Sequence, residues 1–215
     1  MSKILKKDIN KYWNKYKKIY SFEQFSAIYR EQELLKLLSF SRKNVLEIGC
    51  GYRPFFLSTK KFYSYTAIEP GKAPFDSVVK MRKRKKNIKV FNSTFEKWSS
   101  LNPNIKVDLI ILPGVLHEVD DALQFLKLCV KHIKNKGKIY INVPNANSLH
   151  RKIAVAMNII KKNTDRSDRN RKLQQNYIFS IKDLRKLVKQ SSKNLRILKI
   201  KTFFLKPFTH DQMLK

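Results

Sequence analysis

Two carboxylates in the sequence are placed where they could hold a ligand. Glu47 closes the apolar run NVLEI and is followed at once by Gly49 and Gly51. Glycine has no Cβ, so a Gly-x-Gly turn can bend sharply and bring its backbone close to a bound molecule. Glu69 closes the next apolar run, YSYTAIE. An acid about 20 residues beyond a glycine-rich turn is placed to accept hydrogen bonds from both hydroxyls of a ribose.

The alternation of the chain from residue 44 onward predicts the elements that bring these residues together. Short apolar runs alternate with segments long enough for helices, which is typical of βαβ units in a parallel sheet. The predicted strands are residues 44–49, 63–69, 88–91, 107–112 and 137–143. We therefore expect an α/β fold, a Rossmann-like and mostly parallel sheet flanked by helices, which binds its ligand outside the carboxyl ends of the strands.

Two further segments complete the predicted domain organisation. Residues 1–40 have aromatic and apolar side chains at helical spacing and predict an N-terminal helical cap, ahead of a sheet domain at 41–215. The cap either packs on the sheet as a helix pair or covers the ligand. Residues 148–178 interrupt the alternation after the fifth strand and predict an insertion or lid, whose polar part is expected to be exposed and mobile.

The order of the motifs resembles class I S-adenosylmethionine-dependent methyltransferases. VLEIGCG, TAIEP, VDLIILPGVLHEVDD and GKIYINVPNANSLHR follow one another as in that family, most closely as in the group that contains ubiquinone- and menaquinone-pathway enzymes. The resemblance covers residues 40–150 and, more loosely, the chain to residue 210. It implies S-adenosylmethionine as the cofactor, and it identifies the cofactor better than the acceptor.

The resemblance also implies which residues contact the cofactor. They lie at the carboxyl ends of the first four predicted strands. The implied contacts are Glu47, Gly49, Cys50 and Gly51 for the methionine part, Glu69 and Pro70 for the ribose, Ser93, Thr94 and Phe95 for the adenine, and Leu112, Pro113 and Gly114 beside the sulfonium.

Three features depart from the family pattern. Arg53 stands in place of the third glycine of the loop, and Asn92 stands where many relatives have an acid near the adenine. The family ends in an antiparallel strand hairpin, whereas this chain offers one late strand over residues 195–205, after a helix that Ser180 is expected to cap. The edge of the sheet is then expected to need cover, from a homodimer or from another partner.

His117 follows the fourth predicted strand, close to where the resemblance places the methyl group. A histidine there can act as general base on an acceptor hydroxyl or amine, because free imidazole titrates near pH ~6.5. The alternative is a histidine at a helix N-terminus that makes a structural hydrogen bond. Glu118, Asp120 and Asp121 are expected in the first turn of the following helix, where negative charge suits the helix dipole.

Three residues are candidates for the acceptor side of the site. His150 and Arg151 follow the fifth predicted strand, and the guanidinium of Arg151 would suit a carboxylate or phosphate on the acceptor. Tyr177 begins a segment that the resemblance places near the site. The alternative for all three is a surface position. The expected reaction is methyl transfer to oxygen or nitrogen of a small-molecule or glycan-type acceptor.

The net charge is +31, from 47 Lys and Arg against 16 Asp and Glu. Such a charge attracts polyanions such as RNA, DNA or anionic lipid, and residues 80–89 are strongly basic. An RNA methyltransferase is therefore one alternative, and it predicts basic residues on one face around the cofactor. A compositional origin is the other explanation, because Lys, Asn and Ile share AT-rich codons. A non-catalytic scaffold with a methyltransferase fold is a further alternative.

Other sequence features argue against several classes of protein. Cys50 and Cys129 form no CxxC pair, so no metal site or redox motif is predicted, and neither is placed as the nucleophile of base C5-methylation. The segment LPGV replaces the Asp/Asn-Pro-Pro-aromatic motif of enzymes that methylate amino groups in DNA. No apolar run approaches the ~20 residues of a membrane span, and the polar N-terminus has no signal core, so a cytoplasmic location is expected.

Overall fold

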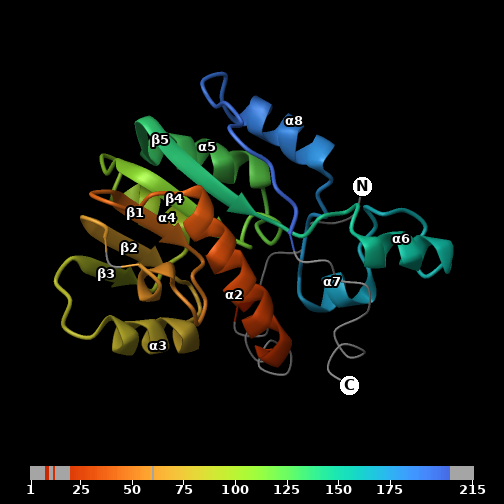
Figure 1. Cartoon of the computed structure of the whole chain (residues 1–215), viewed down its shortest axis with the longest axis horizontal. Helices are drawn as coiled ribbons and strands as arrows, with labels where there is room; N and C mark the ends of the chain where they lie inside the picture. Colours follow the sequence, from red (N-terminus) through yellow and green to blue (C-terminus); the bar gives the residue numbers. More distant parts are fainter. Residues whose placement is uncertain (1–7, 10–11, 13–19, 60, 204–215) are drawn as a thin grey trace.

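A five-stranded parallel sheet forms the centre of the computed structural model, which describes residues 8, 9, 12, 20–59 and 61–203 (Figure 1). The strand order is β3-β2-β1-β4-β5. The strands are β1 (Asn44–Ile48), β2 (Ser64–Ile68), β3 (Ile88–Phe91), β4 (Val107–Pro113) and β5 (Ile133–Asn142). The predicted Rossmann-like fold class is confirmed. β5 begins before the predicted residue 137, because a register shift between Val107 and Leu109 admits the extra residues of a bulge.

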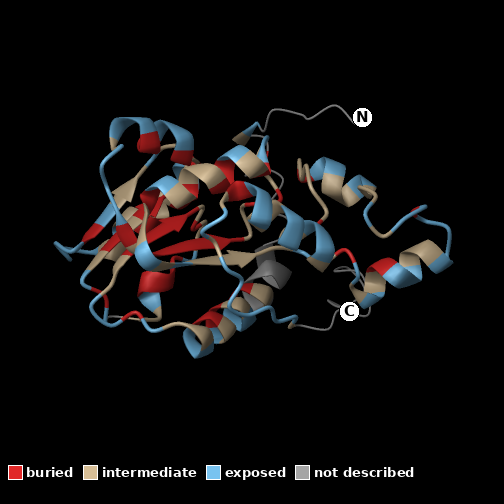
Figure 2. Cartoon of the chain, turned by 90° about the horizontal axis from the view of Figure 1, so that it is seen from above, coloured by how far each residue is buried: buried red, intermediate tan, exposed pale blue. Residues whose placement is uncertain are grey.

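Helices cover both faces of the sheet and build two apolar cores. The face toward α4 and α5 buries side chains such as Trp98 and Phe125, and the face toward α2 and α3 buries Leu34, Tyr65 and Val78 (Figures 1 and 2). The helices are α2 (Tyr20–Leu37), η1 (Phe55–Leu57), α3 (Lys72–Arg82), α4 (Phe95–Leu101), α5 (Ala122–His132), α6 (Leu149–Ala156), α7 (Asp168–Lys172) and α8 (Ile181–Ser191).

The central strands read as continuous apolar runs because helices cover both of their faces. Ile110, Ile111 and Leu112 of β4 are fully buried, and each such side chain contributes roughly 1.5–3 kcal/mol by leaving water. Strand pairing puts Ile48 opposite Ile68 at the ends of β1 and β2. The residues that follow these two strands therefore emerge side by side at the carboxyl edge of the sheet.

The segment after β5 is built around a buried arginine. α6 and α7 lie beyond the carboxyl edge of the sheet (Figures 1 and 2). Arg151 of α6 is 7% exposed; its Nε donates to the carbonyl of Asn163 at 2.5 Å, and Nη2 donates to the carbonyl of Asp165. Leu173 is also buried. The predicted exposure of the polar stretch holds for many of its side chains, but Leu173 is an exception, and the stretch supplies the carbonyls that bind Arg151.

The C-terminal part of the chain agrees with the sequence in one respect and departs from it in another. Ser180 caps α8, and its side chain and that of Asp183 form the reciprocal bonds of a capping box, as predicted. The predicted late strand is wrong over its described residues, 195–203, which pair with no strand. Lys201 in this stretch instead forms an ion pair with Glu33 of α2. The described sheet consequently ends at β5.

The predicted N-terminal cap is described in part. α2 is one long helix that crosses in front of the sheet (Figure 1). The rest of the predicted helix pair lies outside the described residues, except for the short stretches at residues 8, 9 and 12. None of the described helices is long and apolar enough to cross a bilayer. Among the described residues, no three His, Cys, Asp or Glu side chains gather as metal ligands.

Candidate active site

The glycine turn after β1 and the acid after β2 are joined by a hydrogen bond. Gly51 N donates to Glu69 Oε2 at 2.8 Å, and Gly71 N donates to Glu69 Oε1 at 2.9 Å. Glu69 is 2% exposed, and it lines the same cleft as Gly49 and Gly51. A carboxylate offers about four acceptor positions, so two backbone donors leave capacity for ligand hydroxyls. The two sequence motifs that predict a ligand site thus form one structure.

Glu47 lies behind the turn rather than in the cleft. Its side chain is fully buried, and Oε2 accepts from Tyr65 Oη at 2.7 Å and from Phe55 N at 3.2 Å. Burial raises the pKa of Glu47 to about 8, because the charged form loses its hydration, and the Tyr65 hydrogen bond offsets only part of this cost. Glu47 links β1, β2 and η1. Its predicted contact with the ligand would be indirect.

The end of β3 and the start of α4 form the next wall of the cleft. Thr94 caps α4, with Oγ1 accepting from Lys97 N at 3.3 Å. Phe95 is 2% exposed and stacks on Trp98 in the core, yet it also borders the cleft. Asn92 donates through Nδ2 to the carbonyls of Glu69 at 2.9 Å and Pro70 at 3.1 Å. The Asn92 side chain therefore fixes the loop that carries Glu69.

The end of β4 opens the cleft next to Gly114, which adopts a positive φ of +89°. A Cβ placed on Gly114 would lie 3.7 Å from Arg30 Nη1 and 3.9 Å from His117 Cε1. The Gly114 backbone, the Arg30 guanidinium and the His117 imidazole thus border the same small space. Leu112 is fully buried behind it and does not border the cleft, whereas Pro113 and Gly114 do.

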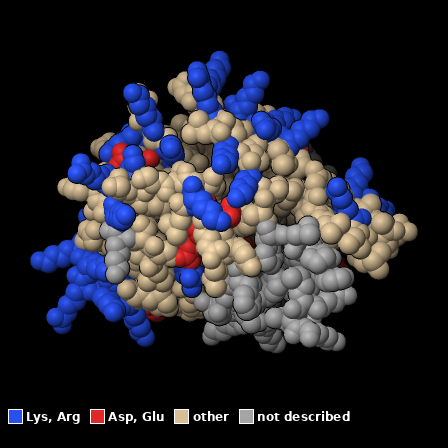
Figure 3. Space-filling model, in the orientation of Figure 1, with Lys and Arg blue, Asp and Glu red and all other residues tan. Residues whose placement is uncertain are grey.

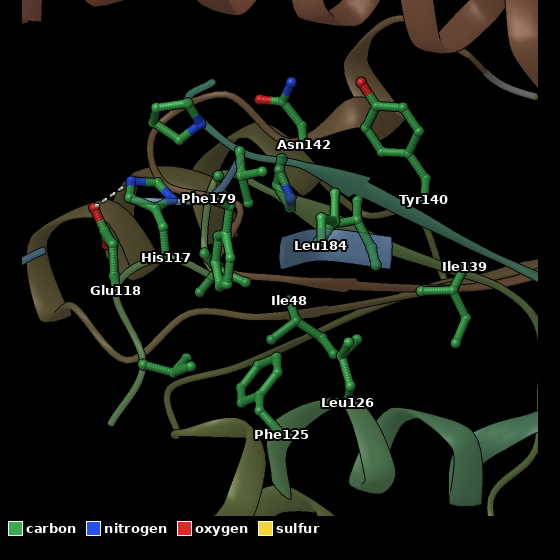
Figure 4. Close-up of a pocket in the computed structure, with 18 of the residues that line it drawn as sticks. Ile48, His117, Glu118, Phe125, Leu126, Ile139, Tyr140, Asn142, Phe179 and Leu184 are labelled. Carbon is green, nitrogen blue, oxygen red and sulfur yellow. Dashed lines mark ion pairs between the residues drawn. The ribbon is translucent and has the colours of Figure 1, made fainter. Parts of the chain in front are cut away.

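His117 lies in the loop between β4 and α5, with 5% of its surface exposed. Its backbone carbonyl accepts from Asn176 N at 3.0 Å and Tyr177 N at 3.1 Å, and Nε2 lies 3.7 Å from Glu118 Oε1 (Figure 4). The alternative of a helix N-terminal position for His117 is wrong, because α5 starts at Ala122. The same holds for Glu118, which also precedes the helix.

Asp121 is the residue that caps α5. Its Oδ1 accepts from Leu123 N at 2.9 Å and from Gln124 N at 3.0 Å. Asp120 precedes the cap, and its carbonyl accepts from Tyr177 Oη at 2.8 Å. The prediction that Glu118, Asp120 and Asp121 all lie in the first turn of the helix is therefore wrong. Asp121 caps the helix, Glu118 and Asp120 lie in the loop before it, and all three border the cleft.

The three acceptor-side candidates have different surroundings. His150 borders the cleft. The guanidinium of Arg151 donates hydrogen bonds to backbone carbonyls of its own segment. The predicted role of Arg151 as a ligand for an anion is therefore wrong, and its side chain instead stabilises this segment. Tyr177 stacks on Phe179 with ring centroids 5.4 Å apart, and its hydroxyl holds the loop before α5. Tyr177 therefore positions the His117 loop from behind, and does not border the cleft.

Three residues in or beside the cleft were given no individual role by sequence reasoning, because their partners are remote in the chain. Arg30 of α2 borders the cleft, and its Nε is buried with no hydrogen-bond partner among the described residues. Tyr12 is 8% exposed and donates from Oη to Glu118 Oε1 at 3.2 Å. Glu31 accepts from Arg53 Nε at 2.7 Å, which ties α2 to the glycine loop.

The cleft has a polar mouth and an apolar wall. His117 and Glu118 lie at one side, and Tyr140 and Asn142 of β5 lie at the other, with apolar side chains between them (Figure 4). Cys50 borders the cleft, and burial raises the pKa of its thiol, which keeps the thiol protonated. The predicted cofactor contacts that border the cleft are Gly49, Cys50, Gly51, Glu69, Pro70, Thr94, Phe95, Pro113 and Gly114.

The chain is similar to methyltransferases in sequence pattern and in fold. A family described as a methyltransferase domain matches residues 22–196. The plantazolicin methyltransferase BamL, solved with a triazolic desmethylPZN analogue and SAH, superposes with a TM-score of 0.64 at 17% identity, over 82% of this chain and 67% of that chain. A SAM-dependent methyltransferase of Thermotoga maritima, described as a possible histamine N-methyltransferase, gives 0.56 at 20% identity, over 83% and 75%.

Similarity to curated sequences is shorter. The peramine synthetase ppzA of Metarhizium rileyi (strain RCEF 4871) is 25% identical over 135 residues, which are 58% of this chain and 5% of that protein. The chain thus corresponds to a small part of that relative. The solved neighbours share the fold, and the family match covers most of the chain. The chain therefore belongs to the methyltransferase domain family, and the predicted class I methyltransferase fold is confirmed.

Proposed function

We propose that this chain methylates an oxygen or nitrogen atom of a small-molecule or glycan-type acceptor, with S-adenosylmethionine bound at the carboxyl ends of β1, β2 and β4. The observation that carries the proposal is the hydrogen bond between Gly51 N and Glu69 Oε2, which joins the two ligand motifs at one cleft. Within the family, we place the chain in the group that contains ubiquinone- and menaquinone-pathway enzymes, as a hypothesis. The methyl group arrives already activated by the sulfonium of the bound cofactor.

The chain's own residues then have three tasks: to bind, to align and to keep out water. Glu69 accepts the ribose hydroxyls on the lone pairs that Gly51 and Gly71 do not use. Arg30 offers a cation for a carboxylate beside Gly114, since its Nε has no partner in the described structure. α2 closes over the cleft through the Arg53–Glu31 pair.

His117 is the proposed general base. Its imidazole Cε1 approaches the space beside Gly114, where the acceptor would meet the methyl group. Glu118, which lies 3.7 Å from His117 Nε2 and is held by Tyr12, stabilises the imidazolium that forms when His117 takes the acceptor's proton. His117 would remove one proton from the acceptor hydroxyl or amine. Transfer would form the bond between the acceptor atom and the methyl carbon and break the methyl–sulfur bond, so that the cofactor would leave as a neutral thioether.

Replacing Glu69 by alanine is expected to weaken S-adenosylmethionine binding by about 1–3 kcal/mol, or about 5- to 150-fold in Kd. The charge-assisted hydrogen bonds to the ribose are lost, and the amides of Gly51 and Gly71 lose their acceptor. Isothermal titration calorimetry measures the affinity. Asp183→Ala removes a carboxylate from the cap of α8, away from Glu69, and serves as the control. Equal affinities for wild type and Glu69→Ala would remove Glu69 from the site.

Replacing His117 by alanine is expected to lower turnover about 100-fold, the typical contribution of a positioned base, with the cofactor Kd little changed. Single-turnover methylation over a range of pH measures the effect. His132→Ala is the matched control, since this buried histidine bonds Ser99 and the Ile105 carbonyl away from the cleft. Retained turnover in a folded His117→Ala protein would show that alignment alone drives the transfer.

A methylation assay against fractionated metabolites and, separately, total RNA tests the acceptor class. The RNA alternative predicts basic residues around the cofactor. α3 instead starts beside the cleft and ends at Arg82, so the basic stretch at 80–89 lies at the opposite edge of the sheet. Calorimetry with S-adenosylmethionine separates an enzyme from a scaffold, because a scaffold would give no binding heat.

A further inference from the structure

The amino edge of the sheet, opposite the glycine turn and Glu69, is basic along its whole length. Each strand is preceded there by lysine or arginine, since every loop at this edge carries at least one. We call this set the basic edge: Arg42, Lys43, Lys61, Arg82, Lys83, Arg84, Lys85, Lys86, Lys106, Lys131, Lys134 and Lys136. Figure 3 shows part of it as a dense group of lysine and arginine at the lower left, over the end of α3.

Backbone hydrogen bonds join the loops of the basic edge into one surface. Arg42 N donates to the Lys61 carbonyl at 3.0 Å, and Tyr63 N donates to the Lys43 carbonyl at 2.9 Å. Asn87 Nδ2 donates to the carbonyl of Tyr63 at 3.3 Å, which attaches the loop before β3. These contacts fix the positive charges relative to one another across three neighbouring strands.

The same surface continues across β4 and β5. Lys106 Nζ donates to the carbonyl of Lys131 at 2.5 Å, and Lys134 Nζ lies 3.1 Å from Asp108 Oδ1. Asp108 is the single acid among the described residues of these loops and the first two residues of each strand. It also accepts a hydrogen bond from Asn44 N. The positive charge of the edge is thus almost uncompensated.

Large apolar side chains protrude from the basic edge. Tyr63 is 73% exposed just before β2, Leu101 is 72% exposed at the end of α4, and Ile105 is 41% exposed before β4. The Ile105 carbonyl bonds His132 Nδ1, so this loop is attached to the end of α5. The surface therefore combines positive charge with apolar side chains that are exposed to water.

We propose that the basic edge binds the anionic headgroups of a lipid surface, with Tyr63, Leu101 and Ile105 entering the interface. Nine of its twelve cations are lysine, whose point charges suit a diffuse negative surface. Nucleic-acid readout favours the bidentate fork of arginine, and it has no use for protruding Leu and Ile side chains. Interfacial binding uses both, because apolar groups and cations add their contributions there.

This arrangement leaves the glycine turn and Glu69 away from the basic edge. α3 begins beside Glu69 and ends in the basic edge, and it spans about 16 Å, from 11 residues at 1.5 Å each. The carboxyl ends of the strands therefore point away from a membrane that meets the amino ends. Lipid binding is accordingly expected to be independent of S-adenosylmethionine and of the proposed methylation, so the two proposals can fail separately.

Flotation of the full chain with vesicles tests the proposal. Vesicles of equal parts phosphatidylcholine and phosphatidylglycerol are expected to carry the protein, in a manner that weakens with salt, and vesicles of phosphatidylcholine alone are not. The variant K83Q/R84Q/K85Q/K86Q should bind the anionic vesicles on the order of 100-fold more weakly, because each basic side chain near such a surface contributes several-fold. Thermal unfolding confirms that the variants fold.

The control removes the same number of charges from the other end of the molecule. K152Q/K161Q/K162Q/K172Q alters exposed lysines of the α6–α7 segment and should change vesicle affinity by less than about fivefold. Equal losses in the two variants would overturn the proposal, because they would reflect net charge alone. No binding to anionic vesicles would overturn it as well.

A single apolar change identifies the class of partner. Leu101→Ser keeps every charge and should weaken vesicle binding several-fold, since one buried aliphatic side chain contributes that much at an interface. A polyuridine oligonucleotide is titrated in parallel. If Leu101→Ser leaves vesicle binding unchanged while K83Q/R84Q/K85Q/K86Q loses oligonucleotide binding, the basic edge is a nucleic-acid surface and the lipid proposal is overturned.

Discussion

Gly49→Val is expected to abolish detectable S-adenosylmethionine binding while the protein remains folded. Gly49 adopts a φ of +74°, a conformation that β-branched residues strongly avoid. An added Cβ would lie 3.0 Å from Val115 Cγ2 and 3.3 Å from Val115 Cβ, so the β1 turn and the β4 loop would be pushed apart. Those two loops form adjoining walls of the cleft, and the cofactor pocket would be deformed from both sides.

Calorimetry checks the loss of affinity, and thermal unfolding checks the fold. A matched control is Gly137→Ala in the bulge of β5, where an added Cβ would lie 2.7 Å from Ile133 Cγ1. That variant should lose stability, because the bulge must shift. It should keep its cofactor affinity, because the bulge lies at the amino end of β5, away from the glycine turn and Glu69. If Gly49→Val binds as tightly as wild type, the turn after β1 contributes nothing to the site and the proposed position of the cofactor is wrong.

The sheet and its ligand edge could be predicted because local signals and fold agree. Apolar runs of four to seven residues separated by helical segments specify buried parallel strands, and the predicted strands match the observed ones closely. The Ser180 cap of α8 follows from a pattern of two residues three positions apart. Parallel topology alone then places Gly49 and Glu69 at neighbouring strand ends.

The errors arise where burial or remote contacts decide the structure. Glu47 faces away from the cleft because alternation along β1 turns its side chain toward Tyr65 and the face covered by η1, and a sequence does not reveal which face meets the ligand. The stretch 195–203 alternates like a strand, yet it reaches α2 through the Lys201–Glu33 pair, and β5 pairs with β4 alone among the described strands. Tertiary contacts there outweigh strand propensity.

Contacts across more than 100 residues were likewise beyond sequence reasoning. Tyr12 reaches Glu118, and Asp8 N donates to Gln174 Oε1 at 2.6 Å. Both bonds bring the N-terminal residues to the mouth of the cleft, next to the segment after α7. The prediction of a helical cap over residues 1–40 named no partner for these side chains. Arg30 was hidden for the same reason, since a single arginine in α2 carries no local signal.

Glu47→Gln is expected to abolish a fall in stability of the wild-type protein between pH 5 and pH 8. The pKa of Glu47 rises from 4.5 in an exposed carboxyl to about 8 in the folded chain, because burial penalises the charged form. The folded state therefore holds a proton that the unfolded chain releases over this range. The free energy of unfolding must then decrease as pH rises, by up to about 4 kcal/mol.

Glutamine has the shape of the protonated acid and stays neutral at every pH, and its carbonyl can still accept from Tyr65. Glu47→Gln should therefore match wild type near pH 5 and exceed it near pH 8. Urea unfolding at each unit of pH measures this. Glu33→Gln is the control, because Lys201 and Lys36 lower the pKa of Glu33. Loss of a carboxyl with a lowered pKa cannot remove a decrease in the free energy of unfolding as pH rises. Parallel pH curves for wild type and Glu47→Gln would show that Glu47 carries no buried proton.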